Sequence, residues 1–462
     1  MKKLPQVEVR YNDALVGLVA QGRVESFFQF DPAFLKDSVD LSPISTPRRA
    51  RPYISRDADF HFLPPFLADS LPDRYGMNIM ERWFRKRKGD LFKPSAVDML
   101  GYVGQRGLGA LTYHPSARFE DSMLREFDLH QQEKLARAGV AMVPDQALET
   151  LRRVVGSAGG SYPKALLAID TKTNRFFEDD PRLGRGYDRW IIKFGRTVKN
   201  QGGSLLNHPR VEHAYHRMAA AAGIATADTT LVPSTIEKEQ VYHFMTRRFD
   251  VLSDGTRRHM LSLSALTGLD AGGGALDYRT FLAATHQVTG DVGAMKEVYR
   301  RMVFNVLACN GDDHGKNHAF LFDGHHWALS PAYDLTFYDE GDVYAPVEHS
   351  LAVNGERTNI RWDDVRKEGE VAGLDAAVIR TIFTDVLDTV ARTRSFAAEA
   401  GVPLDRVHFL GTKVDATLER IGRPPTPLPR RGQIGRRSSS KRAGSGPRGR
   451  VGSRNRREGS TR

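Results

Sequence analysis

The sequence contains one dense polar cluster inside an apolar region, Asn310-Gly311-Asp312-Asp313-His314-Gly315-Lys316-Asn317. Asp312 and Asn317 have the Asp-x-x-x-x-Asn spacing of a protein-kinase catalytic loop. In that loop the Asp accepts the proton of the attacking hydroxyl and the Asn binds Mg²⁺. Asp334 follows after a short apolar-aromatic segment, where such a site needs a second metal-binding carboxylate. The alternative is an ordinary polar turn, because Asp, Asn, Gly and His are common in loops.

Apolar residues on both sides of the cluster favour the phosphoryl-transfer interpretation. Val303-Phe304 and Val306-Leu307 precede it, and residues 319–322 follow it. A loop fixed between buried elements can hold several charges close together, which a solvated turn does not do. The interpretation then requires the other parts of a phosphate site upstream.

A glycine-rich bend precedes an apolar strand near residue 164. Gly159, Gly160 and Ser161 are small enough for backbone N–H groups to approach phosphate oxygens, and Lys164 adds positive charge. Hairpin turns have similar compositions, so the bend alone is weak evidence.

One lysine lies among bulky apolar residues in the predicted strand 188–195. Lys193 would be costly to bury without an anionic partner, and a nucleotide phosphate is such a partner. About twenty residues later, Glu212 lies in a predicted helix over 208–223. In kinases a strand Lys pairs with a Glu on the next helix. The alternative for Glu212 is a solvated surface position.

The order of the remaining segments matches a kinase. Residues 229–232 and 241–249 are predicted as a strand pair that leads through Arg247 and Phe249 into the next lobe; Phe249 either contacts an adenine ring or belongs to the core. Mostly helical segments follow, predicted over 278–288, 292–309 and 376–400. The expected fold class is α+β, a bilobal protein-kinase-like fold with an N-terminal β-rich subdomain and an all-helical C-terminal lobe.

The N-terminal part is predicted to contain short strands at 7–11, 15–19 and 24–30. A helical segment over 65–87 follows, which Pro72 should split in two. The expected domains are an N-terminal subdomain, an N-lobe-like region with the Gly-rich loop, a helical catalytic lobe and a basic tail, at 1–125, 126–250, 251–421 and 422–462.

Composition limits the possible classes of protein. A chain of 462 residues with 40% hydrophobic content predicts two or three domains with large cores. No run of 18 apolar residues occurs, so no membrane span is expected. The single cysteine, Cys309, excludes an internal disulfide and a multi-cysteine zinc site, and its apolar surroundings indicate a small buried residue. These features predict a cytoplasmic protein.

The net charge of +11 comes from the end of the chain. From Arg423 onward there are thirteen Arg or Lys residues and one acidic residue, Glu458, so this tail carries +12. The tail has almost no apolar anchors and is predicted to be disordered. It either attracts nucleic acid through phosphate neutralisation or is an extension without function.

The chain resembles the HipA family of bacterial toxin kinases, the Ser/Thr kinases of type II toxin–antitoxin modules. The most specific similarity lies in the polar cluster, extended to His318, and in the segment Ser330-Pro331-Ala332-Tyr333-Asp334-Leu335. Further similar elements are the 159–165 loop, Ile192-Lys193, Glu212 in its helix, Phe66-Leu67-Ala68-Asp69-Ser70-Leu71-Pro72-Asp73 and Leu100-Gly101-Tyr102-Val103-Gly104.

The resemblance implies ATP and Mg²⁺ as cofactors and a role for each matching residue. Asp312 would be the catalytic base, Asn317 and Asp334 the Mg²⁺ ligands, and Lys193, tethered by Glu212, the phosphate-binding lysine. His314 would lie beside the nucleotide. The phosphate loop would consist of Gly159, Gly160, Ser161 and Lys164, and the adenine-binding hinge would include Arg247 and Phe249.

The resemblance also implies partners. Family members phosphorylate a component of translation such as glutamyl-tRNA synthetase, and they bind HipB, a helix-turn-helix antitoxin that contacts operator DNA. Some autophosphorylate a serine before the phosphate loop, which Ser157 matches, although Ser161-Tyr162-Pro163 departs from the more polar family loop. Two alternatives stay open: a small-molecule or lipid kinase of related fold, and a non-catalytic co-repressor bound to its antitoxin.

Overall fold

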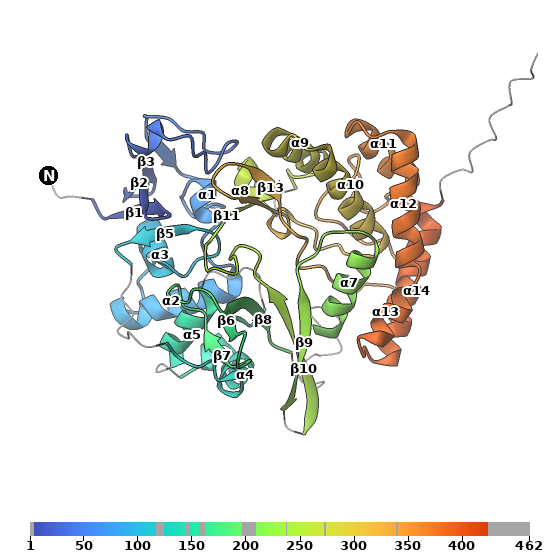
Figure 1. The fold of residues 1–462 in the computed structure, drawn as a ribbon, viewed down its shortest axis with the longest axis horizontal. Helices are drawn as coiled ribbons and strands as arrows, with labels where there is room; N and C mark the ends of the chain where they lie inside the picture. The colour runs from blue at the N-terminus through green and yellow to red at the C-terminus, as the bar shows by residue number, and fades with distance from the viewer. Residues whose placement is uncertain are drawn as a thin grey trace, which may run out of the picture. The chain divides into compact units, whose positions relative to one another are not determined.

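Three antiparallel sheets organise the part of the chain that the structure describes (Figure 1). The structure is a computed structural model, and it describes residues 4–116, 124–144, 147–156, 162–195, 209–236, 238–271, 274–338 and 341–423. These residues belong to one unit, Met1–Arg423. The basic tail from Pro424 onward lies outside the described residues, so its predicted disorder stays a prediction.

The strands are β1 (Gln6–Tyr11), β2 (Ala14–Gln21), β3 (Ser26–Phe30), β4 (Tyr53–Ser55), β5 (Leu111–His114), β6 (Lys164–Asp170), β7 (Phe176–Glu178), β8 (Tyr187–Lys193), β9 (Thr229–Ile236), β10 (Glu239–Arg247), β11 (His259–Ser262), β12 (Ala319–Phe322) and β13 (Trp327–Leu329). The α-helices are α1 (Pro65–Ala68), α2 (Arg74–Lys88), α3 (Ala96–Val103), α4 (Leu129–Ala138), α5 (Leu148–Val155), α7 (Pro209–Ala221), α8 (Leu263–Thr267), α9 (Tyr278–Thr289), α10 (Val292–Leu307), α11 (Trp362–Val371), α12 (Ala376–Val390), α13 (Thr393–Glu399) and α14 (Leu404–Ile421).

The first sheet has the strand order β4-β3-β2-β1-β5 and confirms the three predicted N-terminal strands. Its inward side chains, such as Val9 and Phe28, have no exposed surface. The predicted helical segment is divided into α1 and α2 at Pro72, which cannot donate a backbone hydrogen bond. The turn between these helices, residues 69–73, lies at the edge of the site described below.

The second sheet has the order β7-β6-β8-β10-β9 and places Lys193 at the end of its central strand. In the ladder, Lys193 is opposite Lys164 on β6 and opposite Phe244 on β10. Side chains of directly opposite residues lie on the same face of an antiparallel pair, so the two lysines are neighbours. Their positive charges repel each other, and this face therefore requires anionic partners.

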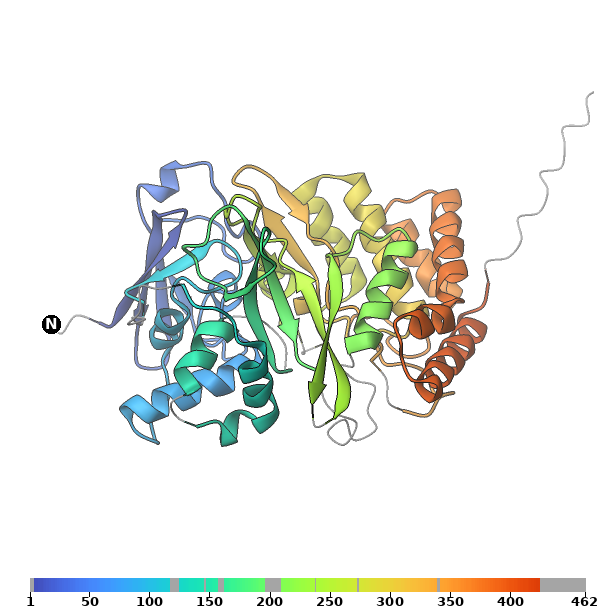
Figure 2. The same cartoon turned by 60° about the horizontal axis from the view of Figure 1, so that its bottom comes forward.

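One of those partners comes from the predicted helix between β8 and β9. The structure confirms that helix as α7, which packs against β9 and β10 (Figure 2). Its buried side carries the apolar residues Val211, Tyr215 and Met218 together with Glu212. Glu212 is 2% exposed, so the prediction of a buried partner is confirmed over the surface alternative.

The C-terminal lobe is mostly helical, but the expectation that it is all-helical is wrong. A third sheet, β11-β12-β13, lies within it. All four residues of β12 are buried, and β12 forms a hairpin with β13 through a turn that contains Asp323-Gly324. An Asp-Gly pair between apolar segments is a hairpin signal. The mixed α+β class itself is confirmed.

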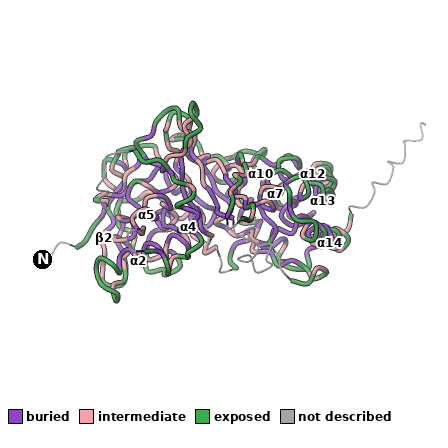
Figure 3. Tube along the Cα trace, turned by 90° about the horizontal axis from the view of Figure 1, so that it is seen from below, coloured by how far each residue is buried: buried purple, intermediate pink, exposed green. Residues whose placement is uncertain are grey.

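Helix α10 leads the chain into the polar cluster. Its last residues and the start of the cluster, residues 301–310, are all buried, and buried positions also run through α7 and the helices around it (Figure 3). The predicted helix over 376–400 is two helices, α12 and α13. The chain turns between them because α12 packs on α10, whereas α13 packs on α7 and α14.

Two expectations from composition can be compared with the structure. Cys309 is fully buried, as predicted. Within the described ranges, no helix combines the length and the apolar character needed to cross a membrane.

Candidate active site

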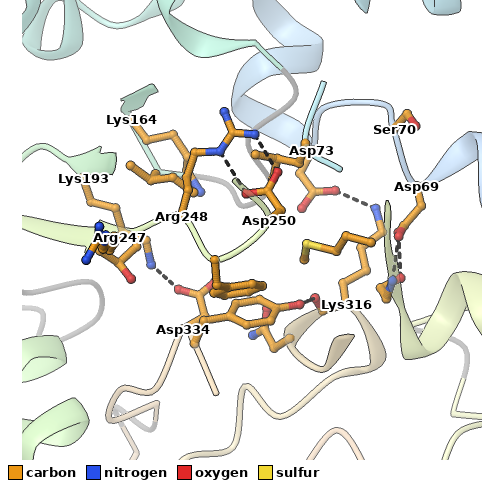
Figure 4. A pocket seen from close by; sticks show the side chains of 18 of the residues that line it. Asp69, Ser70, Asp73, Lys164, Lys193, Arg247, Arg248, Asp250, Lys316 and Asp334 are labelled. Atoms are coloured by element: carbon orange, nitrogen blue, oxygen red, sulfur yellow. Dashed lines mark hydrogen bonds and ion pairs between the residues drawn. The ribbon is translucent and has the colours of Figure 1, made fainter. Parts of the chain in front are cut away.

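Two carboxylates converge on the ammonium group of Lys193. Its Nζ lies 2.6 Å from Oε1 of Glu212 and forms a second ion pair with Asp334, which is 141 residues away in the sequence (Figure 4). Lys193 comes from the end of β8, Glu212 from the first turn of α7, and Asp334 from the segment after β13. The sequence prediction of a strand Lys tied to a helix Glu therefore agrees with the geometry.

Lys193, Glu212 and Asp334 differ in how firmly each side chain keeps its charge. Burial alone would lower the pKa of Lys193, but Asp334 and Glu212 outweigh that cost and raise it. Burial likewise opposes the charge of Asp334, yet Lys193 and Lys164 hold the pKa of this carboxyl well below its usual range. Burial raises the pKa of Glu212 to about 7. Asp334 is thus the firmly ionised partner of Lys193.

Lys164 extends this cluster on the neighbouring strand. It is 3% exposed, and burial followed by repulsion from Lys193 lowers the pKa of its ammonium to about 8. Asp334 and Glu212 act in the opposite direction but do not compensate. A bound polyanion would relieve this repulsion.

The catalytic-loop candidate, residues 310–317, is held by hydrogen bonds on both sides. The side-chain amide of Asn317 donates to the backbone oxygen of Asp312 over 2.7 Å. The buried Asp313 carboxylate accepts from the Ser350 backbone N–H and from the Tyr278 hydroxyl, each over 2.7 Å. Asp313 therefore anchors the loop, while the neighbouring Asp312 side chain keeps one third of its surface exposed, at 32%.

Asp312 has the environment of a proton acceptor. Burial raises the pKa of its carboxyl, and His314 acts in the opposite direction while Asp334 adds to the rise. Nε2 of His314 lies 3.7 Å from Oδ1 of Asp312. A carboxylate whose charge is poorly solvated binds a proton more readily, which suits a general base.

Two adjacent cavities contain the predicted residues. The first is lined by Lys164, Lys193, Glu212, Arg247, Phe249, Asn317 and Asp334, among others. The second is lined by Asp312 and His314 and shares Lys164, Lys193, Asn317 and Asp334 with the first. The shared residues join the two cavities into one cleft, and the candidate phosphate-binding groups stand between the candidate base and the candidate hinge.

Other predicted residues lie at the edges of this cleft or outside the described residues. Phe249 packs against Tyr333 with ring centroids 5.6 Å apart and lines the first cavity, so it is not simply a core residue. Arg247 lines the same cavity and pairs with Asp188. Gly159, Gly160 and Ser161, with Ser157 before them, are outside the described residues, and their predicted roles stay predictions.

Sequence reasoning missed several residues of the cleft wall. They are Asp69, Ser70, Leu71 and Asp73 from the N-terminal subdomain, Asp250 after β10, and Lys316 and Tyr333. The first four lie in a segment that the sequence marks only by its resemblance to the HipA family. Nothing in their spacing from Asp312 indicates that they approach it.

The donor set suits Mg²⁺ with a phosphate ligand. Asp334 supplies a carboxylate, and the side-chain oxygen of Asn317 is an amide acceptor because its nitrogen donates to the Asp312 carbonyl. Magnesium is bound in nucleotide sites by one or two carboxylates together with phosphates and water. Within the described ranges, no group of three or more His, Cys, Asp or Glu side chains forms a self-sufficient metal site. Asp334 and Asn317 fit a metal whose other ligands are phosphate oxygens and water.

The sequence matches two known protein-family domains. The HipA-like C-terminal domain matches residues 156–394, and the HipA N-terminal domain matches residues 7–114. The first match alone covers more than half of the chain.

The chain belongs to the HipA family.

HipA proteins are a family of toxin–antitoxin kinases, and the resemblance inferred from the sequence is confirmed. HipA from Shewanella oneidensis MR-1, solved in complex with HipB and its operator DNA, has a TM-score of 0.64 to this structure at 16% sequence identity. The similarity covers 90% of this chain and 96% of that chain, and it confirms the HipA fold.

A second similarity, to the Helicobacter pylori proinflammatory kinase CtkA, covers 51% of this chain and 88% of that one. Its TM-score is 0.36 at 14% identity, which is too low to bear on the fold. No curated protein matches this HipA-family sequence.

Proposed function

We propose that this protein is an ATP- and Mg²⁺-dependent serine/threonine protein kinase that acts as the toxin of a toxin–antitoxin module. The observation that carries the proposal is the pairing of Lys193 with both Glu212 and Asp334 in the wall of the cleft that also holds Asp312 and Asn317. Phosphoryl transfer requires little covalent chemistry from the protein and depends on positioning and charge neutralisation. The cleft offers both.

Each side chain has a role in this proposal. Lys193 and Lys164 bind phosphate oxygens, and Asp334 and Asn317 would hold Mg²⁺, which neutralises charge on the phosphates. Asp312 accepts the proton of the acceptor hydroxyl and orients it for in-line attack. His314 sits beside Asp312 and favours its ionised form.

The remaining predicted residues complete the nucleotide site. Arg247 and Phe249 line the first cavity, whereas Asp312 lines only the second, and the ring of Phe249 would offer an apolar face to an adenine. Gly159, Gly160 and Ser161 precede Lys164 in the sequence and, with it, would line the phosphate loop. Small residues at these positions allow backbone N–H groups to approach phosphate oxygens.

The proposed partners follow from the family. The Shewanella HipA was solved with HipB and operator DNA, which supports a HipB-like helix-turn-helix antitoxin for this chain and operator binding mainly through that antitoxin. The proposed protein substrate is a component of translation such as an aminoacyl-tRNA synthetase.

Magnesium removal provides the first test. With ATP labelled at the γ-phosphate, the purified full-length protein should transfer label to a protein acceptor, measured on itself and on a host-cell extract. Excess EDTA should abolish the transfer, and added Mg²⁺ should restore it. Label that appears only on small molecules would refute the protein-kinase proposal, and absence of both transfer and ATP binding would refute a nucleotide site.

The buried Lys164 predicts a pH dependence of nucleotide affinity. Its pKa is lowered to about 8 in the free protein, so its charge is present below pH 8 and is lost as the pH rises. A phosphate binds the charged form, and ATP affinity should therefore fall about tenfold between pH 7 and pH 9.5, the value of one charge-assisted hydrogen bond.

The measurement is ATP titration by calorimetry at several pH values. Lys164→Met should bind ATP more weakly at pH 7 and should lose most of the pH dependence. The same slope in the wild type and in Lys164→Met would contradict this assignment.

A further inference from the structure

The turn between α1 and α2 connects the N-terminal subdomain directly to the catalytic loop. Oδ1 of Asp73 lies 2.6 Å from Nζ of Lys316, although 243 residues separate them (Figure 4). Asp73 is the N-cap residue of α2, but its side chain makes no capping hydrogen bond. A position that normally stabilises its own helix is thus directed toward another part of the protein.

A second contact joins the same turn to the start of α8, which packs against the catalytic loop. The Asp69 carboxylate accepts hydrogen bonds from Ser262, over 2.7 Å from its backbone N–H and 2.6 Å from its hydroxyl. Ser262 caps α8, and α8 packs against residues 315–317. The packing is close, since a Cβ added to Gly315 would lie 2.4 Å from Leu276 and 3.4 Å from Ser264.

Lys316 stands at the centre of the cleft. It lines both cavities, together with Asn317 and Asp334, and its backbone oxygen accepts a hydrogen bond from Tyr333 over 2.7 Å. An ammonium group has three N–H donors, and one of them is directed to Asp73. Asp73 fixes one N–H of the Lys316 ammonium group, and Tyr333 fixes the Lys316 backbone. These two contacts restrict the directions in which the other two N–H groups can point.

Stability alone does not account for this ion pair. The side chains of Lys316 and Asp73 are 40% and 24% exposed. Solvent partly screens a pair of this exposure, which limits its contribution to folding. The pair also fixes the position of the Lys316 ammonium group.

We propose that Asp73 is a positioning residue for phosphoryl transfer, which holds Lys316 so that its remaining donors face the transferred phosphate. This inference rests on the proposed kinase function and adds to it that the N-terminal subdomain supplies part of the phosphate site. The transfer site is then incomplete in residues 156–394, the segment that matches the HipA-like C-terminal domain.

The test compares Asp73→Asn with Asp90→Asn in the full-length chain. Asp90 is an exposed carboxylate just beyond the same helix and lies outside the cleft. Steady-state release of the labelled γ-phosphate to water gives kcat and KM for ATP. Asp73→Asn should lower kcat about 10-fold to 100-fold, the cost of misplacing a reacting group, and should change KM for ATP much less. Asp90→Asn should match the wild type.

A double-mutant cycle separates positioning from a structural role. If Asp73 acts through Lys316, adding Asp73→Asn to Lys316→Met should cause no further loss of kcat. Thermal unfolding of each variant controls for folding. Equal kcat in Asp73→Asn and Asp90→Asn, or full additivity in the cycle, would overturn the inference. A wild type that neither binds ATP nor transfers phosphate would instead refute the kinase proposal, so the two failures are distinct.

Discussion

Asp312→Asn should abolish phosphoryl transfer while the protein keeps its fold. General-base residues contribute about 10²-fold to 10⁴-fold to the rate, and we expect a loss of kcat in that range. The amide has nearly the shape of the carboxylate but cannot accept the hydroxyl proton. Because Asp313, not Asp312, anchors the loop through Ser350 and Tyr278, the loop should remain in place.

The same substitution should leave stability unchanged or increase it. Burial raises the pKa of Asp312 in the folded protein. A carboxyl whose pKa is higher in the folded state than in the unfolded state binds protons more tightly when folded, so folding becomes less favourable as pH rises through that interval. At neutral pH the ionised Asp312 is therefore a cost to folding, which its amide replacement removes. Residues kept for function often have this property.

The measurement pairs transfer of labelled phosphate with thermal unfolding at pH 7. Asp388→Asn, an exposed carboxylate on α12, serves as the matched control and should change neither quantity. Retained transfer in Asp312→Asn would eliminate Asp312 as the base. A lower Tm with lost transfer would show that Asp312 supports the fold, and the loss of activity would then say little about catalysis.

Local sequence patterns were sufficient for the part of the site that follows kinase spacing. Asp312 and Asn317 are close in sequence, and the loop geometry brings the Asn317 amide to the Asp312 carbonyl. Lys193 ends a strand and Glu212 lies on a helix that follows it in the chain, and elements that are close in sequence order are usually adjacent in space. The cost of burying a charge also made Lys193 predictable as a site residue, because a lone lysine in an apolar strand requires an anionic partner.

The N-terminal contribution could not be predicted in this way. Asp73 and Lys316 meet because α1 packs on α8 and α8 packs on residues 315–317, a chain of contacts between distant segments. No periodicity or spacing encodes such a contact. The third sheet was missed for a related reason. β11 precedes its partner β12 by more than fifty residues, although the β12–β13 hairpin carries a readable Asp-Gly signal.

Asp334→Asn should also remove phosphoryl transfer, but with the opposite effect on stability. The substitution takes away a metal-binding carboxylate and the firmly ionised partner of Lys193. We expect a loss of about 10²-fold to 10³-fold or more in kcat, comparable to removing a group that stabilises charge in the transition state. Asparagine is the right replacement, because Asp334 has a φ of 56° and Asn tolerates this left-handed conformation better than Ala does.

The loss of stability follows from the pKa of Asp334, which is held below its usual value by Lys193 and Lys164 despite burial. Because the pKa of this carboxyl is lower in the folded than in the unfolded protein, its charge stabilises the fold at any pH above the unfolded-state pKa. This contribution is lost as the pH falls from the unfolded-state pKa through the folded-state pKa. Breaking its charge-assisted hydrogen bond should cost about 1–3 kcal/mol at pH 7, with Glu212 left to pair with Lys193.

Thermal unfolding of Asp334→Asn, Asp312→Asn and the Asp388→Asn control at pH 7 tests this contrast directly. We expect a Tm order with Asp334→Asn lowest and Asp312→Asn equal to or above the control, although both cleft variants lose transfer. The deficit of Asp334→Asn should persist from pH 7 to pH 5, because both pH values lie above the ordinary pKa of an Asp carboxyl. Equal Tm values for the two cleft variants would mean that Asp334 does not neutralise Lys193 in the folded protein, and the charge arrangement on which the phosphate site depends would have to be abandoned.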